Sequence, residues 1–183
     1  MKAIGLRRWS RDEYDGMIAA GLFGPDEHVE LIDGEILALP PNGTLHATAI
    51  QLAQDALRAA FGPEFNVRAQ LPLACGADSE PQPDIAVVSG TPRLYRDAHP
   101  TSALLIVEIS DSTLEHDRNR KSRLYARTGI QEYWIVNLID RRIEVCRHPD
   151  EASYHSSQCY CPGECILPLA ASGAPVAVLD LLP

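Results

Sequence analysis

The chain has 183 residues, of which 45% are hydrophobic and 22% are charged, and these proportions are those of a globular protein with one core. They exclude a disordered chain, and the length indicates a single domain. The formal net charge of −9 argues against the large basic groove that a dedicated nucleic-acid-binding protein carries.

The amino terminus has no apolar stretch of signal-peptide length, and no apolar run approaches the ~18 residues of a transmembrane helix. We therefore expect a cytoplasmic protein with no membrane partner. Five cysteines, an odd number, suggest free thiols rather than a disulfide framework. His155, Cys159, Cys161 and Cys165 lie close together in the sequence, but their spacing matches none of the common structural zinc patterns, so we expect no zinc.

The first 40 residues predict a helix followed by a hairpin. Ser10 with Glu13 forms the signature of a helix-initiating capping box, and a stripe of apolar residues follows it. Two strand-like runs flank the dipeptide Asp33-Gly34, which is a strong signal for a two-residue hairpin turn. Glu30, in the first of these runs, faces either a site or solvent, and its own sequence context favours solvent.

Residues 44–61 carry apolar side chains at helical spacing, so we expect a helix there. His46 lies in its first turn, where a histidine is usually a cap or a surface residue, although the start of a helix also suits contact with an anion. A strand is predicted over 67–75. Because Pro72 cannot donate a hydrogen bond within a sheet, this strand should be an edge strand or contain a bulge.

Two carboxylates belong to strands that follow each other in the sequence. Asp84 comes directly after Pro83 and opens the run 84–88, although aspartate is a poor strand former. Glu108 lies inside the apolar run 104–109, whose composition indicates a strand buried on both faces. A buried carboxylate is costly to keep ionised unless a partner, a metal or a shifted pKa compensates, so Glu108 requires an explanation.

Residues 114–128 have the spacing of a helix, and the run 131–138 predicts another strand after it. Strand, helix and strand in this order form a right-handed parallel unit, which returns the start of the helix toward the strand end that carries Glu108. Beyond this unit, 142–147 alternates as a strand does. The tail over 154–182 predicts a small β-meander that closes the core or covers a partner surface.

The predicted helix also carries a lysine. Asp117, Lys121 and Tyr125 recur at intervals of four, so they share one helix face. Since only two of the sixteen basic residues are lysines, a lysine at 121 suggests a need for a compact charge whose pKa burial can shift. A solvated helix face explains the pattern equally well. Two carboxylates on neighbouring strands with a nearby ammonium are what a divalent metal site for phosphodiester cleavage requires.

With these residues the chain resembles the Uma-type family of putative restriction endonucleases, within the PD-(D/E)XK nuclease superfamily. The resemblance covers nearly the whole chain, and it is carried by WSRDEYDGMIAAGLFGPDEHVELIDGEI, the helix start with His46, PQPDIAVV, LLIVEISDST and DRNRKSRLYARTGIQEYWIVN. It implies the α/β (α+β) class, with a restriction-endonuclease-like mixed β-sheet flanked by helices and a C-terminal β-meander. The single nuclease-like domain then consists of an N-terminal helix and hairpin over 1–40, a core over 41–148 and a C-terminal β extension over 149–183.

The resemblance also implies roles for individual residues. Asp84 and Glu108 match the two acids that hold a Mg²⁺ or Mn²⁺ ion, together with the backbone carbonyl of Ile109. Glu30 resembles the N-terminal glutamate that completes the acidic cluster in many superfamily members, so it is expected as an outer or second metal ligand. The expected cofactor is therefore a divalent cation bound by oxygen atoms.

The superfamily usually places its catalytic lysine two residues beyond the second acid, where this chain has Ser110. Lys121 matches the helix lysine that takes over in this family, so it completes the expected catalytic set. His46, Ser110 and Arg118 are candidate contacts to the substrate phosphate. Asn137 replaces the aspartate that usually ends the strand after the helix, which we expect to matter little because it lies in a strand-end turn.

Together these features predict a metal-dependent endonuclease that hydrolyses phosphodiester bonds in DNA and acts as a homodimer. The alternative is a catalytically inactive nuclease fold that serves as a binding or assembly module. The acidic charge of the chain favours this alternative. The retained set of Asp84, Glu108 and Lys121 disfavours it, because an abandoned site has no reason to keep buried charges.

Overall fold

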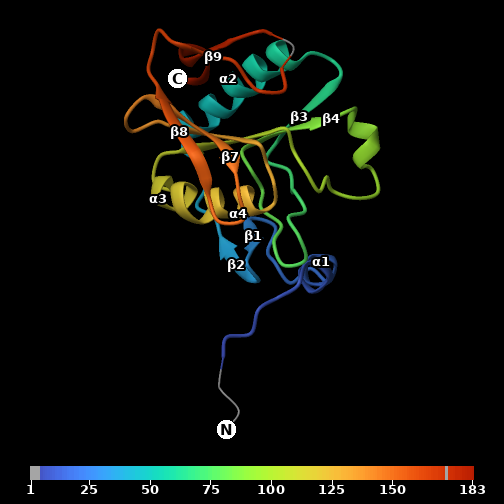
Figure 1. Cartoon of the computed structure of the whole chain (residues 1–183). Helices are drawn as coiled ribbons and strands as arrows, with labels where there is room; N and C mark the ends of the chain where they lie inside the picture. The colour runs from blue at the N-terminus through green and yellow to red at the C-terminus, as the bar shows by residue number, and fades with distance from the viewer. Residues whose placement is uncertain (1–4, 172) are drawn as a thin grey trace.

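A six-stranded mixed β-sheet forms the centre of the protein (Figure 1). The computed structural model describes residues 5–171 and 173–183. In spatial order the strands are β3 (Phe65–Ala69), β4 (Ile85–Ser89), β5 (Leu105–Ser110), β6 (Glu132–Asn137), β7 (Arg142–Pro149) and β8 (Tyr154–Tyr160). β5 and β6 pair in parallel, and the other neighbouring strands of this sheet are antiparallel.

The predicted strand-helix-strand unit is present in the middle of this sheet. All residues of β5 and β6 are buried, as expected for strands that are covered on both faces. Their connection is helical but irregular, and it consists of α3 (Leu114–His116), the π-helical turn η2 (Asp117–Lys121) and α4 (Ser122–Arg127). Gly129 ends it with a φ of 78°, a left-handed conformation that glycine adopts most easily.

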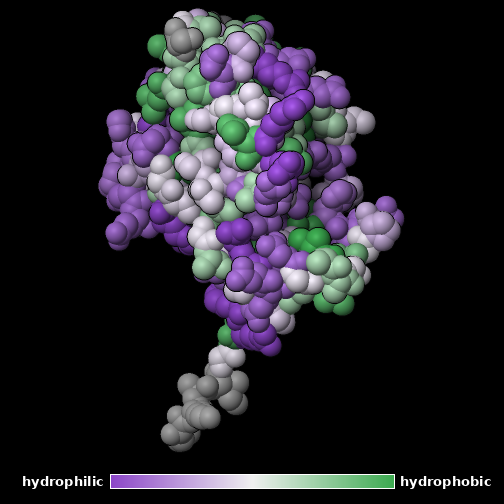
Figure 2. All heavy atoms as spheres, turned by 90° about the vertical axis from the view of Figure 1, so that its right-hand side faces the viewer, coloured by the Kyte–Doolittle hydropathy of each residue, from purple (hydrophilic) through white to green (hydrophobic). Residues whose placement is uncertain are grey.

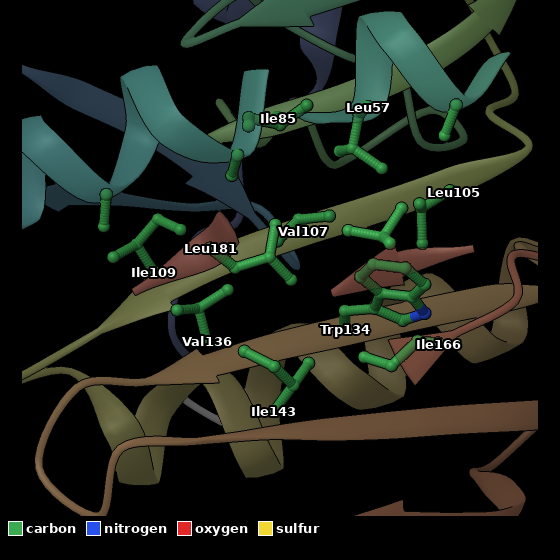
Figure 3. Packing of buried hydrophobic residues seen from close by; sticks show 14 of the residues in the cluster. Leu57, Ile85, Leu105, Val107, Ile109, Trp134, Val136, Ile143, Ile166 and Leu181 are labelled. Carbon is green, nitrogen blue, oxygen red and sulfur yellow. The ribbon is translucent and has the colours of Figure 1, made fainter. Parts of the chain in front are cut away.

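Helices cover both faces of the sheet, so two apolar layers enclose it. α2 (Thr44–Phe61) lies over one face, and α3 and α4 lie over the other (Figure 1). Figure 3 shows the layer beneath α2, where Leu57 of the helix packs in one cluster with Ile85, Val107 and Trp134 of three strands. The opposite layer contains Tyr125 of α4. Side chains that alternate along β5 therefore enter different layers, and Glu108 points to the α4 side.

The N-terminal elements agree closely with the predictions, and they are α1 (Arg11–Ala19), β1 (Val29–Ile32) and β2 (Glu35–Ala38). The capping box is complete, because Ser10 and Glu13 each bind the backbone of the other through their side chains. Asp33 and Gly34 both have positive φ angles, 54° and 72°, as the predicted hairpin turn requires. Of the apolar stripe on α1, Tyr14 is buried and donates a hydrogen bond to the Val29 carbonyl at 2.9 Å.

The strand predicted over 67–75 is shorter than expected and begins earlier. β3 ends at Ala69, because Gln70 adopts a φ of 51° and turns the chain out of the sheet. β3 is an edge strand of the central sheet, but Pro72 lies beyond its end, so the proline is not what places it at the edge.

The C-terminal tail is only partly the simple meander that was predicted. β8 forms the second edge of the central sheet, beside β7. β9 (Cys165–Ile166) pairs with β10 (Val176–Ala177) instead of with β8, so the consecutive strands β8 and β9 do not form a hairpin. The 3₁₀ turn η3 (Val178–Leu181) follows, and its buried apolar side chains close the layer beneath α2.

The face of the molecule in Figure 2 does not indicate a particular partner. Hydrophilic residues dominate the face shown in Figure 2, and hydrophobic residues are scattered among them rather than gathered in one patch. None of the helices in the described ranges is both long and apolar enough to cross a membrane.

Candidate active site

Asp84 and Glu108 lie side by side on neighbouring strands. Asp84 immediately precedes β4, and the antiparallel pairing of Ile85 with Val107 of β5 brings it next to Glu108. The backbone amide of Asp84 donates a hydrogen bond to Glu108 Oε2 at 3.2 Å, and the amide of Ile109 donates to Asp84 Oδ2 at 2.8 Å. Strand pairing therefore fixes the two carboxylates relative to each other.

Lys121 joins these carboxylates from the helical connection. Its Nζ lies 3.0 Å from Glu108 Oε1 and 3.4 Å from Glu30 Oε2, and all three side chains are buried. The backbone amide of Gln82 donates a hydrogen bond to Glu30 Oε2 at 3.2 Å. The solvent-facing interpretation of Glu30 was therefore wrong. β1 docks with both of its faces covered, a feature that the alternation of residues within a short strand does not reveal.

The pKa values of Glu108 and Lys121 depend on burial and on the charges of the neighbouring side chains. Burial raises the pKa of Glu108 above its ordinary value, and Lys121 and the hydroxyl of Tyr125 oppose this shift. Burial alone would lower the pKa of Lys121, but Glu108 and Glu30 raise it, so the ammonium stays charged. The result is a permanently charged lysine beside a carboxylate whose ionisation a further cation would favour.

His46 reaches the same group from the first turn of α2. Its Nε2 lies 3.1 Å from Asp84 Oδ1, and the side chain is buried, so neither the capping nor the surface interpretation is correct. Gly43 occupies the N-cap position instead. Burial alone would lower the pKa of His46, but the hydrogen bond and charge of Asp84 raise it overall. The imidazole is therefore more readily protonated than a free histidine side chain.

A cavity of about 370 Å³ opens beside these residues. Five of the predicted site residues line it, namely His46, Asp84, Glu108, Ile109 and Lys121. Glu30 is not among the lining residues, so it contacts Lys121 from behind. The volume suits one small group of a substrate rather than a whole macromolecule.

Besides Glu30, the predicted residues Ser110 and Arg118 are also absent from the lining of the cavity. Ser110 is buried and its Oγ donates a hydrogen bond to Asp117 Oδ2 at 2.7 Å. Arg118 Nε and Nη2 bind the carboxylate of Glu144 on β7, at 2.9 and 2.6 Å. Both side chains therefore already have strong partners within the protein.

The Arg118–Glu144 pair leads to a prediction about stability. Burial alone would raise the pKa of Glu144, but hydrogen bonds from Arg118 and Asn137 lower it to about 2. Because this value lies below the ordinary 4.5, the pair stabilises the fold above pH 4.5, and this contribution is lost as the pH falls toward 2. We expect Glu144→Gln to lower the free energy of unfolding by about 2 kcal/mol near neutral pH and by little at the acid end.

Thermal unfolding of the variant and the parent at several pH values measures this difference. Glu115 offers a matched control, because it pairs with the same guanidinium of Arg118 at 3.5 Å but is largely exposed. Glu115→Gln should change the melting temperature little at any pH. A pH-independent effect of Glu144→Gln would show that shape, and not charge, explains its role.

The structure adds residues to this group to which the sequence interpretation gave no role. Tyr125 donates a hydrogen bond from its hydroxyl to Glu108 Oε1 at 2.6 Å. Asp117 lines the cavity, and His116 Nε2 lies 3.8 Å from Glu30 Oε1. The four-residue spacing of Asp117, Lys121 and Tyr125 was the signal that could have identified two of these three residues. No comparable pattern marked the histidine.

The donor set fits a hard divalent cation. Asp84 and Glu108 offer carboxylate oxygens at the cavity, and Ile109 would add its backbone carbonyl. Within residues 5–171 and 173–183, no group of three or more His, Cys, Asp or Glu side chains is arranged to hold a metal ion.

The chain is similar to known proteins in both sequence and fold. A family model described as Uma2, putative restriction endonuclease, matches residues 11–175. The fold is similar to the crystal structure of a putative nuclease belonging to DUF820 from Anabaena variabilis, with a TM-score of 0.70 and 18% sequence identity. That similarity covers 89% of this chain and 94% of the other, and it confirms the predicted fold class. No curated protein matches the chain.

Proposed function

Because this chain belongs to the Uma2 family of putative restriction endonucleases, we propose that it is a Mg²⁺- or Mn²⁺-dependent endonuclease that hydrolyses phosphodiester bonds in DNA. The observation that carries this proposal is the convergence of Asp84, Glu108 and Lys121 at one cavity. They come from three separate elements, and burying each of these charges opposes folding. A group of buried charges that opposes folding is best explained by a function that requires those charges.

The roles that we propose follow from the contacts of each residue. Asp84, Glu108 and the Ile109 carbonyl would hold the metal, which when bound lowers the pKa of a coordinated water and polarises the phosphate. Lys121 keeps its charge beside Glu108 and Glu30, so its ammonium can stabilise negative charge that develops on the phosphoryl oxygens.

His46 and Glu30 would assist the metal ligands and the lysine through separate contacts. His46 is oriented by Asp84, and its raised pKa suits donation of a hydrogen bond to a phosphate oxygen in the cavity. Glu30 holds Lys121 from behind and does not line the cavity, so we propose that it orients the ammonium rather than coordinating the metal directly. Both roles leave the open space of the cavity to substrate and water.

A non-cleaving binding or assembly module remains the second candidate. One observation favours it: Lys121 pairs with both Glu108 and Glu30, so these charges satisfy one another without a ligand. The cavity of about 370 Å³ beside them argues for the enzyme, because a purely structural ion pair gains nothing from open space next to it.

We further propose that the enzyme acts in the cytoplasm as a homodimer. The formal net charge of −9 opposes long-range attraction to the phosphate backbone of DNA. A cleft between two copies would enlarge the contact surface around each scissile phosphate. The divalent cations at both sites would also offset the local negative charge.

A calorimetric titration with Mn²⁺ tests the metal centre directly. We expect the parent protein to bind Mn²⁺ with roughly micromolar affinity and Glu108→Ala to bind none, because the variant loses a charged oxygen ligand. Plasmid nicking in the presence of Mn²⁺, with a chelator as the control, then tests the reaction. If neither the parent nor the variant takes up the ion, the binding module becomes the better explanation.

A further inference from the structure

Tyr125 is a buried residue that contacts the site without reaching the cavity. It lies in α4, it is fully buried, and it is not among the residues that line the cavity. Its hydroxyl donates a hydrogen bond to Glu108 Oε1 at 2.6 Å. Any influence of Tyr125 on the chemistry must therefore pass through Glu108.

The hydrogen bonds of Glu108 are distributed unevenly over its two oxygens. Oε1 accepts from Tyr125 at 2.6 Å and from Lys121 at 3.0 Å, so both of its lone pairs are engaged. Oε2 accepts one hydrogen bond, from the backbone amide of Asp84 at 3.2 Å, and it retains a second lone pair. The carboxylate can therefore offer a cation one oxygen but not both.

We infer that Tyr125 is a positioning residue that restricts Glu108 to coordination through Oε2 alone, and that this restriction makes the site select Mg²⁺ or Mn²⁺ over Ca²⁺. This inference rests on the proposed function. Mg²⁺ requires near-ideal octahedral geometry, which a single carboxylate oxygen satisfies. Ca²⁺ accepts more ligands in flexible arrangements, including carboxylates that bind through both oxygens.

Tyr133 provides a matched control in the same layer. It is also fully buried, and its ring lies 5.2 Å from the ring of Tyr125 between centroids. Its hydroxyl donates to the backbone carbonyl of Asp117 at 3.2 Å and makes no hydrogen bond to Glu108. Removal of either hydroxyl thus deletes one buried hydrogen bond. Of these two hydroxyls, only that of Tyr125 donates to Glu108, the proposed metal ligand.

The experiment measures the dissociation constants of Mn²⁺ and Ca²⁺ by calorimetry for the parent, Tyr125→Phe and Tyr133→Phe. We expect Tyr125→Phe to weaken Mn²⁺ binding about ten- to a hundredfold, the effect usual for a residue that orients a metal ligand. Ca²⁺ binding should change much less, because a mobile Glu108 can use both oxygens. Tyr133→Phe should leave the ratio of the two constants unchanged.

The possible outcomes separate this inference from the proposed function. Melting temperatures of both variants control for folding, and Lys121 still serves Oε1 in Tyr125→Phe, so that oxygen is not left without a donor. An unchanged ratio in Tyr125→Phe, or equal changes in both variants, overturns the positioning role while the metal site stands. If the parent protein binds neither ion, the proposed metal site fails, and the role of Tyr125 fails with it.

Discussion

Asp84→Asn and Glu108→Gln should each reduce DNA cleavage by about a thousandfold while the protein keeps its fold. Each change removes a negative charge from the cavity and keeps nearly the same shape, so the cation loses a charged ligand. A thousandfold loss corresponds to about 4 kcal/mol of transition-state stabilisation. Initial rates of plasmid nicking with Mn²⁺ measure the effect, and circular dichroism verifies the fold.

Glu132 offers a matched control for these variants. It is buried on β6, next to the strand of Glu108, and it binds Arg147 with a shortest distance of 2.5 Å, but it does not line the cavity. Glu132→Gln should therefore lower the melting temperature and leave cleavage within about threefold of the parent. Full activity in Asp84→Asn or Glu108→Gln would contradict the assignment of the metal ligands.

Lys121→Met is expected to have the second large effect, on stability as well as on cleavage. Glu30 and Glu108 are both buried, and the substitution leaves them near each other without the cation that each now contacts. Breaking a buried ion pair in this way costs about 3–5 kcal/mol. Cleavage should fall by about a hundred- to a thousandfold, because the positive charge beside the phosphate is lost.

Two measurements separate the structural and catalytic parts of the Lys121 effect. Because the pKa of Glu108 is raised by burial, its protonation at lower pH should restore part of the stability of Lys121→Met. The double variant Lys121→Met/Glu30→Gln removes one of the two unpaired charges and should also recover stability, but it should not recover cleavage. A stable Lys121→Met that cuts DNA normally would show that the ammonium has neither role.

The centre of the fold could be predicted because its signals are local. β5 and β6 are continuous apolar runs, and the helical connection between them carries its side chains at regular intervals. Once a parallel unit is inferred, the proximity of Glu108 and Lys121 follows from its handedness. The π-helical turn could not be predicted in the same way, since it depends on how the helix fits against the sheet.

The surroundings of the site depend on contacts between distant segments, which no local pattern encodes. Glu30 faces Lys121 because its hairpin docks against the segment before β4, where Leu31 forms a β-bridge with Glu80. His46 is buried because α2 crosses the sheet close to Asp84. From the sequence alone, Glu30 and His46 were both compatible with a solvent-exposed position.

The predicted phosphate contacts show a related limit. Arginine and serine suit phosphate binding, but they suit carboxylates equally well. Arg118 is bound by Glu144 of β7, and Ser110 is bound by Asp117 of the helical connection. Competition of this kind between ligand and protein partners is decided by tertiary structure.

The order in which the site is assembled from the chain has a consequence for biosynthesis. Its charged residues extend from Glu30 to Lys121 along the sequence, and the pairs that join them close long loops. A chain released before the helical connection has no lysine at the site, and a chain whose N-terminal hairpin has not docked lacks the carboxylate behind it. The proposed cleavage therefore requires a chain that extends past Lys121 and has docked its N-terminal hairpin, so shorter chains lack the complete site.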